Sequence, residues 1–544
     1  MSKKRPNHCG KPMHLHDTNK HGRQRYRCAV CKTSMIENRS EEHTHGYDVD
    51  LANDNAKKIQ LLVKKNKHNK FVITSAINNT EAWQDYLLSL QKYCDHNNAT
   101  LIIVPVPYKN VTAFSSNKER KKWWDDSIVP FFVDDDIYLG GNIMLMAGTR
   151  IGATMANPLS GKAAIGGHRW TIFAHPQLAL EPVATPINTM PKKMYTTGAV
   201  TVKNYSRTNE GKKAEFHHVM GAIVVETIGD SHSFVRQLNA GDDGSFYDLE
   251  YHYTPRGAKK YDHIEVLAPG DEHAKFVLDS VKRATYSNRD SIVNTLKPRM
   301  IVRNDILDGY AGSHHHAKDP MLQFKKFHND DDNYRKELDQ CVAYVNETTP
   351  NYAVSVFVAS NHHDHLTKWL NTVDPNKDHK NALLISELNV AVRQAILEDR
   401  DYDPFRLYLE PRLTCKNKFL SRNERFVVGE VDYSQHGDVG VNGAKGNARG
   451  LANTCAKMVI GHSHGARIVK GVYQTGTSTG SLEYEKGLGD HSNTHCIQYP
   501  NGKRCLIDII DGQWRHTKRT ETQRKNKIKK KTIDRRKKVA TIHK

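Results

Sequence analysis

A pair of metal-binding side chains marks the second half of the chain. The stretch Gly-His-Ser-His-Gly at 461–465 comes directly after the apolar run 458–460. Histidine is the commonest metal ligand and also transfers protons near neutral pH. Two histidines one residue apart face one centre only if the backbone bends between them. A chain with 31 histidines produces such a pair easily by chance, so the pair needs support from other positions.

Four further polar clusters supply that support. They read DEH at 271–273, NDILD at 304–308, SNHHD at 360–364 and QHGD at 435–438. Each follows an apolar run that predicts a buried strand; the five runs are 264–268, 300–302, 353–359, 426–433 and 458–460. A layered α/β fold collects strand ends along one edge, where such proteins place their chemistry. We therefore expect the five clusters to form one site.

The order D-x-H, (G)D-x-x-D, N-H, H and G-H-x-H resembles the calcineurin-like metallophosphoesterases, including recombination-repair nucleases of the SbcD type. The resemblance covers about residues 261–515 and implies an α/β fold of the four-layer type, with two sheets flanked by helices. Two positions depart from the pattern. Asn304 stands where the family has Gly, and His363 stands where it has an acidic residue, with Asp364 one place later.

The resemblance implies two divalent metal ions with a shared carboxylate. One ion would take Asp271, His273 and His464, the other Asn361, His436 and His462, and Asp305 would bridge them. Oxygen and imidazole ligands together suit Mn²⁺, with Mg²⁺, Fe or Zn²⁺ as alternatives. Such a metal pair activates water and stabilises an in-line displacement at phosphorus.

The resemblance also implies a catalytic histidine. His362 would orient the phosphate and protonate the leaving oxygen. Either Asp364 or Asp308 would hold this histidine, and the sequence leaves both open. A rival D-x-H lies at Asp230 to His232, but only the shorter separation of Asp271 from Asp305 fits one helix and one strand.

Composition predicts a cytoplasmic protein that meets nucleic acid. The 544 residues carry a net charge of +20, and cationic side chains displace counterions from phosphates. No apolar run is long enough for a transmembrane helix, and the basic N-terminus lacks the apolar core of a secretory signal. The nine cysteines form no disulfide framework of the secreted kind.

Residues 1–40 predict a small zinc ribbon. Cys28 and Cys31 form a C-x-x-C pair, and Cys9 lies earlier with His14 and His16 nearby. One structural Zn²⁺ needs four nitrogen or sulfur ligands, so we expect Cys9, Cys28 and Cys31 with His14 or His16. A segment this short needs such a staple to fold. The string RYRCAVC resembles ribbons at the head of transposases and other DNA-acting proteins.

Between the ribbon and the motifs lie a linker, 41–70, and an α/β or α+β region, 71–260, without an assigned role. Strands at 71–74 and 101–106 flank an amphipathic helix at 81–95, which predicts a β-α-β unit. At the other end of the chain, strands at 497–499 and 505–507 flank an Asn-Gly turn, which predicts an outer hairpin.

The last segment, 516–544, is a basic tail. From residue 515 onward the chain carries 14 Lys or Arg. A like-charged block of this kind binds nucleic acid in many proteins, and the alternative is a solvated helical face.

These features together predict a metal-dependent DNase. We expect DNA as its partner, no membrane contact, and self-association or an accessory protein in addition. The Asn- and Lys-rich sequence also resembles early phage proteins that degrade host DNA, which implies action in the host cytoplasm. The alternatives are an RNA or protein phosphatase of the same fold and a non-catalytic DNA-binding adaptor.

Overall fold

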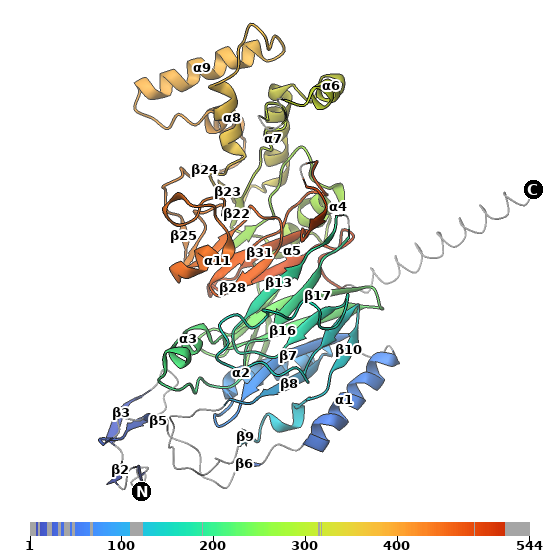
Figure 1. The fold of residues 1–544 in the computed structure, drawn as a ribbon, viewed down its shortest axis with the longest axis vertical. Coiled ribbons are helices and arrows are strands. Elements are labelled where there is room, and N and C mark those ends of the chain that lie inside the picture. Colours follow the sequence, from blue (N-terminus) through green and yellow to red (C-terminus); the bar gives the residue numbers. More distant parts are fainter. Residues whose placement is uncertain are drawn as a thin grey trace, which may run out of the picture.

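The fold is known from a computed structural model. It describes residues 7–8, 11–12, 14–18, 24–30, 34–36, 44–45, 49–65, 69–108, 123–187, 189–313, 316, 318–483 and 485–516. Over these residues the chain is a mixed α/β protein with several mixed sheets (Figure 1). Among the described helices, none is long and apolar enough to cross a membrane.

A six-stranded sheet carries the first three motifs. Its order is β24 (Asn417–Phe419), β23 (Val354–Phe357), β22 (Met300–Arg303), β21 (Val266–Ala268), β31 (Thr494–Gln498) and β32 (Arg504–Asp508). Strands β21 to β24 run parallel, so their carboxyl ends share one edge. Strands β31 and β32 form the predicted hairpin, which closes the other side of the sheet.

A ten-stranded sheet carries the other two motifs. Its order is β10 (Ile137–Gly140), β11 (Ile143–Leu145), β12 (Trp170–Phe173), β15 (Lys192–Thr196), β13 (Ala179–Val183), β28 (Arg467–Val469), β29 (Val472–Gln474), β27 (Lys457–Ile460), β26 (Val431–Asp432) and β25 (Val427–Val428). Its two halves join where Ala179 pairs with Val469. The sheet therefore combines strands from both sides of residue 260.

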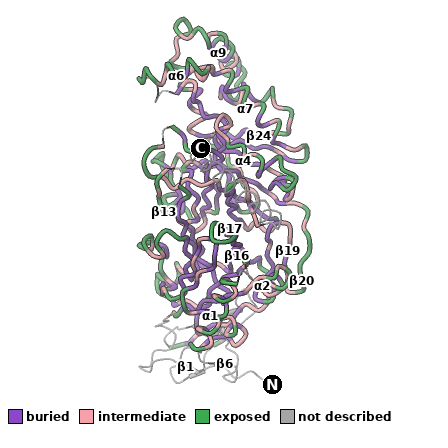
Figure 2. The backbone as a smooth tube through the Cα atoms, turned by 90° about the vertical axis from the view of Figure 1, so that its right-hand side faces the viewer, coloured by how far each residue is buried: buried purple, intermediate pink, exposed green. Residues whose placement is uncertain are grey.

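The two sheets share one buried core. Val302 and Val356 of the six-stranded sheet belong to the same apolar cluster as Val431, Val459 and Ile468 of the ten-stranded sheet. Helices cover the outer face of the six-stranded sheet; those contributing buried side chains include α5 (Ile292–Leu296), α7 (Tyr334–Thr348), α8 (His363–Leu370), α9 (Ala382–Leu397) and α10 (Pro404–Leu409). Helix α11 (Ala448–Leu451) packs on the ten-stranded sheet, and buried residues run through the length of the molecule (Figure 2).

A four-stranded sheet forms the N-terminal part, in the order β17 (His232–Asn239), β16 (Gly221–Ile228), β7 (Lys70–Ile77) and β8 (Thr100–Val106). Strands β7 and β8 are parallel and are joined by α2 (Gln84–Asn97), which confirms the predicted β-α-β unit. Helix α1 (Val49–Lys64) lies beside this part (Figure 1). Three short strands, β18 (Phe246–Asp248), β19 (Tyr251–Thr254) and β20 (Gly257–Lys260), lead on to the six-stranded sheet.

A buried charge cluster ties this sheet to the next hairpin. The Arg236 side chain, 2% exposed, lies 3.0 Å from Glu226 and 2.7 Å from Asp248. Lys70 Nζ lies 2.8 Å from the same Glu226 carboxylate. Every charge in the cluster therefore has an opposite partner, as burial requires.

The ribbon segment is described only in part. Strands β3 (His14–Thr18), β4 (Gln24–Arg27) and β5 (Ser34–Ile36) form an antiparallel sheet. Cys28 is buried and His14 is exposed, whereas Cys9 and Cys31 lie outside the described residues. The structural Zn²⁺ and its ligands therefore stay a prediction, as does the role of the tail beyond residue 516.

The helix predicted between the first two motifs is interrupted. Helix α4 (Asp279–Lys282) continues into a π-helical turn at Arg283–Ser287, and α5 begins separately. Ser291 caps α5 by accepting a hydrogen bond from Asn294 N, which starts a new helix at that point.

Candidate metal centre

Five loops from two sheets meet at one place. The loops after β21, β22 and β23 come from the six-stranded sheet, and those after β26 and β27 come from the ten-stranded sheet. Each loop begins where an apolar strand ends, as the sequence predicts. The structure therefore brings the five polar clusters together between the ends of two packed sheets.

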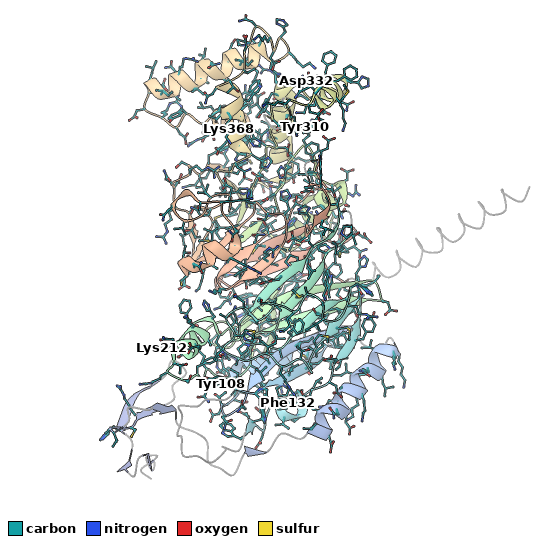
Figure 3. All side chains as sticks on the ribbon, in the orientation of Figure 1. Tyr108, Phe132, Lys212, Tyr310, Asp332 and Lys368 are labelled. Atoms are coloured by element: carbon teal, nitrogen blue, oxygen red, sulfur yellow. The ribbon has the colours of Figure 1, made fainter. Side chains whose placement is uncertain are left out.

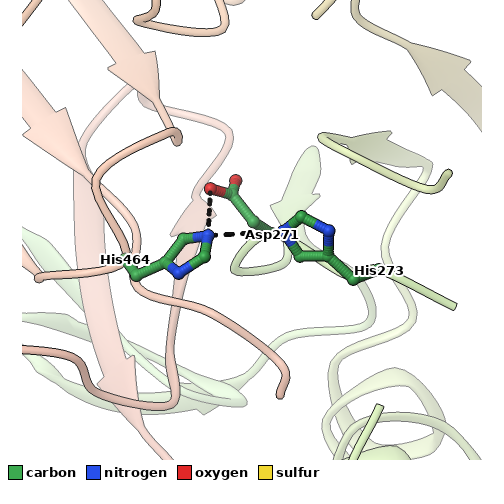
Figure 4. Close-up of side chains that lie close together, drawn as sticks. All are labelled: Asp271, His273 and His464. Carbon is green, nitrogen blue, oxygen red and sulfur yellow. Dashed lines mark hydrogen bonds and ion pairs between the residues drawn. The ribbon is translucent and has the colours of Figure 1, made fainter. Parts of the chain in front are cut away.

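The first group of side chains consists of Asp271, His273 and His464 (Figure 4). His464 Nε2 lies 3.4 Å from Asp271 Oδ2 and 3.3 Å from His273 Nε2. All three residues are buried. One carboxylate and two imidazoles at this spacing can surround a single divalent cation.

A second group of side chains shares Asp271 with the first group. Asp271, Asp305 and His436 also lie within ligand distance of one another. His436 Nε2 is 3.0 Å from Asp305 Oδ2, and His273 Nε2 is 3.9 Å from the same oxygen. Asp305 thus belongs to the second group and also lies near His273 of the first. Asn304, where the family has Gly, places its Oδ1 3.2 Å from His436 Nδ1.

The backbone is strained at four of the proposed ligands. His273, Asp305, His462 and His464 have φ values of 39°, 46°, 73° and 55°. Residues with side chains rarely adopt this left-handed region, and such strain gathers at functional sites. Hydrogen bonds between loops hold it in place, since His273 N donates to Asp305 O at 2.6 Å.

Three side-chain oxygens at the centre lack partners. Asp271 Oδ1, Asp305 Oδ1 and Asn361 Oδ1 are buried and accept no hydrogen bond from any described residue. Buried polar atoms are almost always satisfied, and leaving one unpaired costs roughly 1–3 kcal/mol. Three such oxygens on the loops of the centre fit bound cations, which would satisfy them.

The electrostatics of the centre are strongly coupled. Burial raises the pKa of Asp271 to about 6. Burial works in the same direction on Asp305, but the charge of His436 outweighs it and holds that pKa well below its usual range. For His436, the attraction of Asp305 overcomes burial and raises its pKa to about 9. Burial lowers the pKa of His462, which is half-buried beside His436, to about 4.

His362 lies at the start of α8, with its ring against His273. Its Nδ1 donates a hydrogen bond of 2.7 Å to the backbone carbonyl of Asp308. The Asp308 carboxylate lies 2.9 Å from His273 Nδ1 and 3.9 Å from His362 Nδ1. Asp364 instead pairs with Arg422 at 2.7 Å. The structure therefore places Asp308, of the two aspartates left open by the sequence, beside His362.

Two other sequence positions have structural partners. His363 accepts a hydrogen bond from Ile306 N and stacks on Phe405, and burial lowers its pKa to about 3. This histidine thus holds the second motif loop through its hydrogen bond with Ile306 N. The rival Asp230 lies in the turn after β16 and accepts a hydrogen bond from Tyr138, away from the centre.

A buried ion pair underlies the first two motif loops. Glu272 stands between two proposed ligands, and Arg303 stands two residues before Asp305. The Arg303 guanidinium lies 2.9 Å from Glu272, and neither side chain is exposed. Arg303 also donates to Thr348 and Thr349. This pair was not predicted from the sequence. Two features could have indicated it: a Glu between two proposed ligands, and an Arg in an otherwise apolar strand.

The fold and site define a mixed α/β protein with buried His/Asp groups that can hold metal. No family model matches the chain, and no solved structure does. The chain is 31% identical over 476 residues to protein A1 of Escherichia phage T5, and the match covers 83% of each protein. The chain therefore belongs to the family of phage T5 protein A1.

Proposed function

We propose that this protein is a dinuclear metal-dependent DNase of the calcineurin-like metallophosphoesterase type. The observation that carries the proposal is the convergence of the five motif loops on three buried oxygens that lack hydrogen-bond partners among the described residues. Burial of such groups has a large cost unless a cation compensates it. The arrangement of ligand types also follows the motif order that suggested the family.

The packing of the two sheets supports this proposal. A six-stranded and a ten-stranded sheet share one core; helices cover the outer face of the first, and the short helix α11 packs on the second. Two sheets flanked by helices are what the resemblance to metallophosphoesterases implies. The site lies where the strand ends of both sheets meet, which is the position expected of a catalytic centre in a layered α/β protein.

The chain offers ligands for two ions of the hard or borderline kind. Asp271, His273 and His464 would hold one ion, Asn361, His436 and His462 the other, and Asp305 would bridge them. This mixture of oxygen and imidazole donors suits Mn²⁺ best, with Mg²⁺ as an alternative. When bound, the two ions would lower the pKa of a water molecule and stabilise charge on the phosphate.

In this proposal His362 acts on the leaving group. Its Nδ1 donates to the Asp308 carbonyl, so Nε2 is the atom that can carry a transferable proton. We propose that Nε2 protonates the leaving oxygen of the cleaved strand. Because Asp308 also lies against His273, one residue would align the proton donor with a metal ligand.

Three features favour DNA as the substrate. The net charge is +20, the tail is strongly basic, and the N-terminal segment has the cysteine pattern of a ribbon. Membership in the family of a phage protein supports a role during phage infection. We propose that the protein degrades host DNA in the cytoplasm of the infected cell.

Plasmid DNA gives the direct test. Purified protein should cleave it with Mn²⁺ and stop when EDTA is added. Parallel reactions with RNA and with a phosphoprotein separate the nuclease from a phosphatase of the same fold. Metal-dependent cleavage of either in place of DNA would overturn the substrate assignment. DNA binding without hydrolysis of any of the three would identify a non-catalytic adaptor instead.

A further inference from the structure

We propose that Glu485 is a positioning residue for the metal centre, acting through His464. This inference rests on the proposed function, because it concerns a ligand of the proposed metal pair. Glu485 Oε1 lies 2.8 Å from His464 Nδ1, and each side chain is only 6% exposed. The contact comes from a segment 21 residues beyond the histidine and is part of no motif.

The contact fixes which nitrogen of His464 can bind metal. An ionised carboxylate accepts hydrogen bonds and donates none, so it keeps the hydrogen on Nδ1 and leaves the lone pair on Nε2. Nε2 is the atom that faces Asp271 and His273, at 3.4 and 3.3 Å. Carboxylate partners of this kind orient ligating histidines and make them more basic.

Glu485 is itself held in place. Its second oxygen accepts a hydrogen bond of 2.9 Å from Leu482 N and lies 3.2 Å from His491 Nδ1. Two groups besides His464 therefore fix the carboxylate. The His464 ring is constrained through a carboxylate that has little freedom to turn away.

A further metal site is the alternative reading of this contact. His464, Glu485 and His491 lie within ligand distance of one another. An ion bound by both His464 Nδ1 and Glu485 would, at metal–ligand distances of about 2.0–2.2 Å, hold the two atoms roughly 3.3 Å apart in tetrahedral geometry. The observed 2.8 Å is the shorter distance of a hydrogen bond, which favours a shared proton over a shared ion, and the number of ions bound by the wild type tests this.

A neighbouring glutamate provides a matched control. Glu483 lies two residues earlier and accepts a hydrogen bond of 2.9 Å from Tyr310, which is labelled in Figure 3. It also pairs with Lys325. Neither contact reaches a proposed metal ligand, so Glu483→Gln reports the cost of changing the segment alone.

Metal binding by titration calorimetry and apo-protein melting test the proposal together. Glu485→Ala should weaken one of two Mn²⁺ sites about 10–100-fold, the usual effect of losing such a partner. Glu485→Gln, which keeps the shape and one acceptor oxygen, should weaken it less. Glu483→Gln should leave both affinities unchanged. The melting temperature of apo Glu485→Gln should match that of the wild type.

The outcomes separate this inference from the proposed function. Wild-type protein that binds no Mn²⁺ would overturn the proposed metal centre itself. Two wild-type affinities that persist in Glu485→Ala would overturn only the role of Glu485. Three ions in the wild type and two in Glu485→Ala would replace positioning with a further metal site. Equal weakening by Glu483→Gln would show a general effect of the segment and overturn the assignment.

Discussion

The carboxylate of Asp271 occupies the space in which a side chain on Gly461 would begin. A β-carbon at Gly461 would stand 2.1 Å from Asp271 Oδ1, far inside van der Waals contact. The neighbouring His462 N donates a hydrogen bond of 2.7 Å to the other oxygen of the same carboxylate. The glycine of the last motif is therefore required by the aspartate of the first.

Gly461→Ala should displace Asp271 and impair the centre. We expect DNA cleavage to fall about 100-fold, because a shift of about 1 Å in a reacting group has that order of effect. Rates on plasmid DNA with Mn²⁺ provide the measurement. Gly480→Ala is the control, since its β-carbon would meet only Leu278 at an ordinary 3.5 Å. Equal activity of both variants would mean that Asp271 does not need its present position.

Asp305→Ala should abolish hydrolysis without unfolding the protein. Asp305 lies between the two groups of proposed ligands, so its loss should affect both ions. Circular dichroism would check the fold and calorimetry would count bound Mn²⁺. Full Mn²⁺-dependent activity in a folded Asp305→Ala protein would contradict the whole site assignment.

His362→Ala should keep both metal ions but slow turnover. General acid catalysis contributes roughly 10²–10⁴-fold, so kcat should fall by that order. Asp364→Asn is the informative comparison. Its side chain is 48% exposed and pairs with Arg422, and exposed pairs contribute only about 0–1 kcal/mol. Its kcat should therefore change less than about tenfold. A loss of bound metal in His362→Ala would make this histidine a ligand instead.

Acid should weaken the N-terminal sheet through Glu226. Burial alone would raise the pKa of Glu226, but Arg236 and Lys70 hold it well below its usual range. The folded state therefore binds this proton more weakly than the unfolded state. The stabilisation is complete above the unfolded pKa of about 4.3 and is lost as the pH falls below it.

Glu226→Gln should reveal this dependence. At pH 7 we expect its unfolding free energy to be about 3–5 kcal/mol lower than that of the wild type, because a buried pair loses one partner. Below about pH 4.3 the difference should shrink. Urea unfolding from pH 7 to pH 3 measures both quantities. Glu210→Gln, at an exposed position in α3 (Asn209–His217), is the control. A difference that stays constant over this range would refute the assignment.

Deletion of residues 517–544 should reduce DNA binding and its salt dependence. The cut begins there because Trp514 and Arg515 contact the folded body, with Arg515 at 2.5 Å from Glu250. Each phosphate that the tail no longer neutralises should flatten the slope of log K against log salt by about 0.9. Hydrolysis of bis-p-nitrophenyl phosphate should be unchanged. An unaltered slope would mean that the tail is a solvated segment, and a loss of small-substrate activity would make it part of the catalytic body.

Much of the centre could be predicted because its signals are local. An apolar run followed at once by Asp, Asn or His marks a strand and the loop after it, and five such runs identified the loops that meet. The β-α-β unit of β7, α2 and β8 could be predicted equally well. Apolar runs indicate its two strands, and apolar residues at helical spacing indicate its helix. Asp271 was chosen over Asp230 because only its separation from Asp305 along the chain fits one helix and one strand.

Other relationships leave no local trace. Whether Asp308 or Asp364 supports His362 depends on how α8 leaves its strand, which no spacing specifies. Glu485 reaches His464 from an irregular segment whose path is set by its contacts with other loops. The pairing of β13 with β28 joins distant parts of the chain. The sequence of an apolar strand does not indicate which other strand it pairs with.

That pairing has a consequence for how the protein can be made. Until β28 is synthesised, β13 remains an uncovered edge, and a fragment of residues 261–515 would expose β28 in the same way. Open edges of this kind invite pairing with other chains. The ligand histidines 462 and 464 directly precede β28. The order of synthesis therefore keeps the centre unassembled until His464 and β28 have been made, and neither half of the ten-stranded sheet is a natural unit for separate expression.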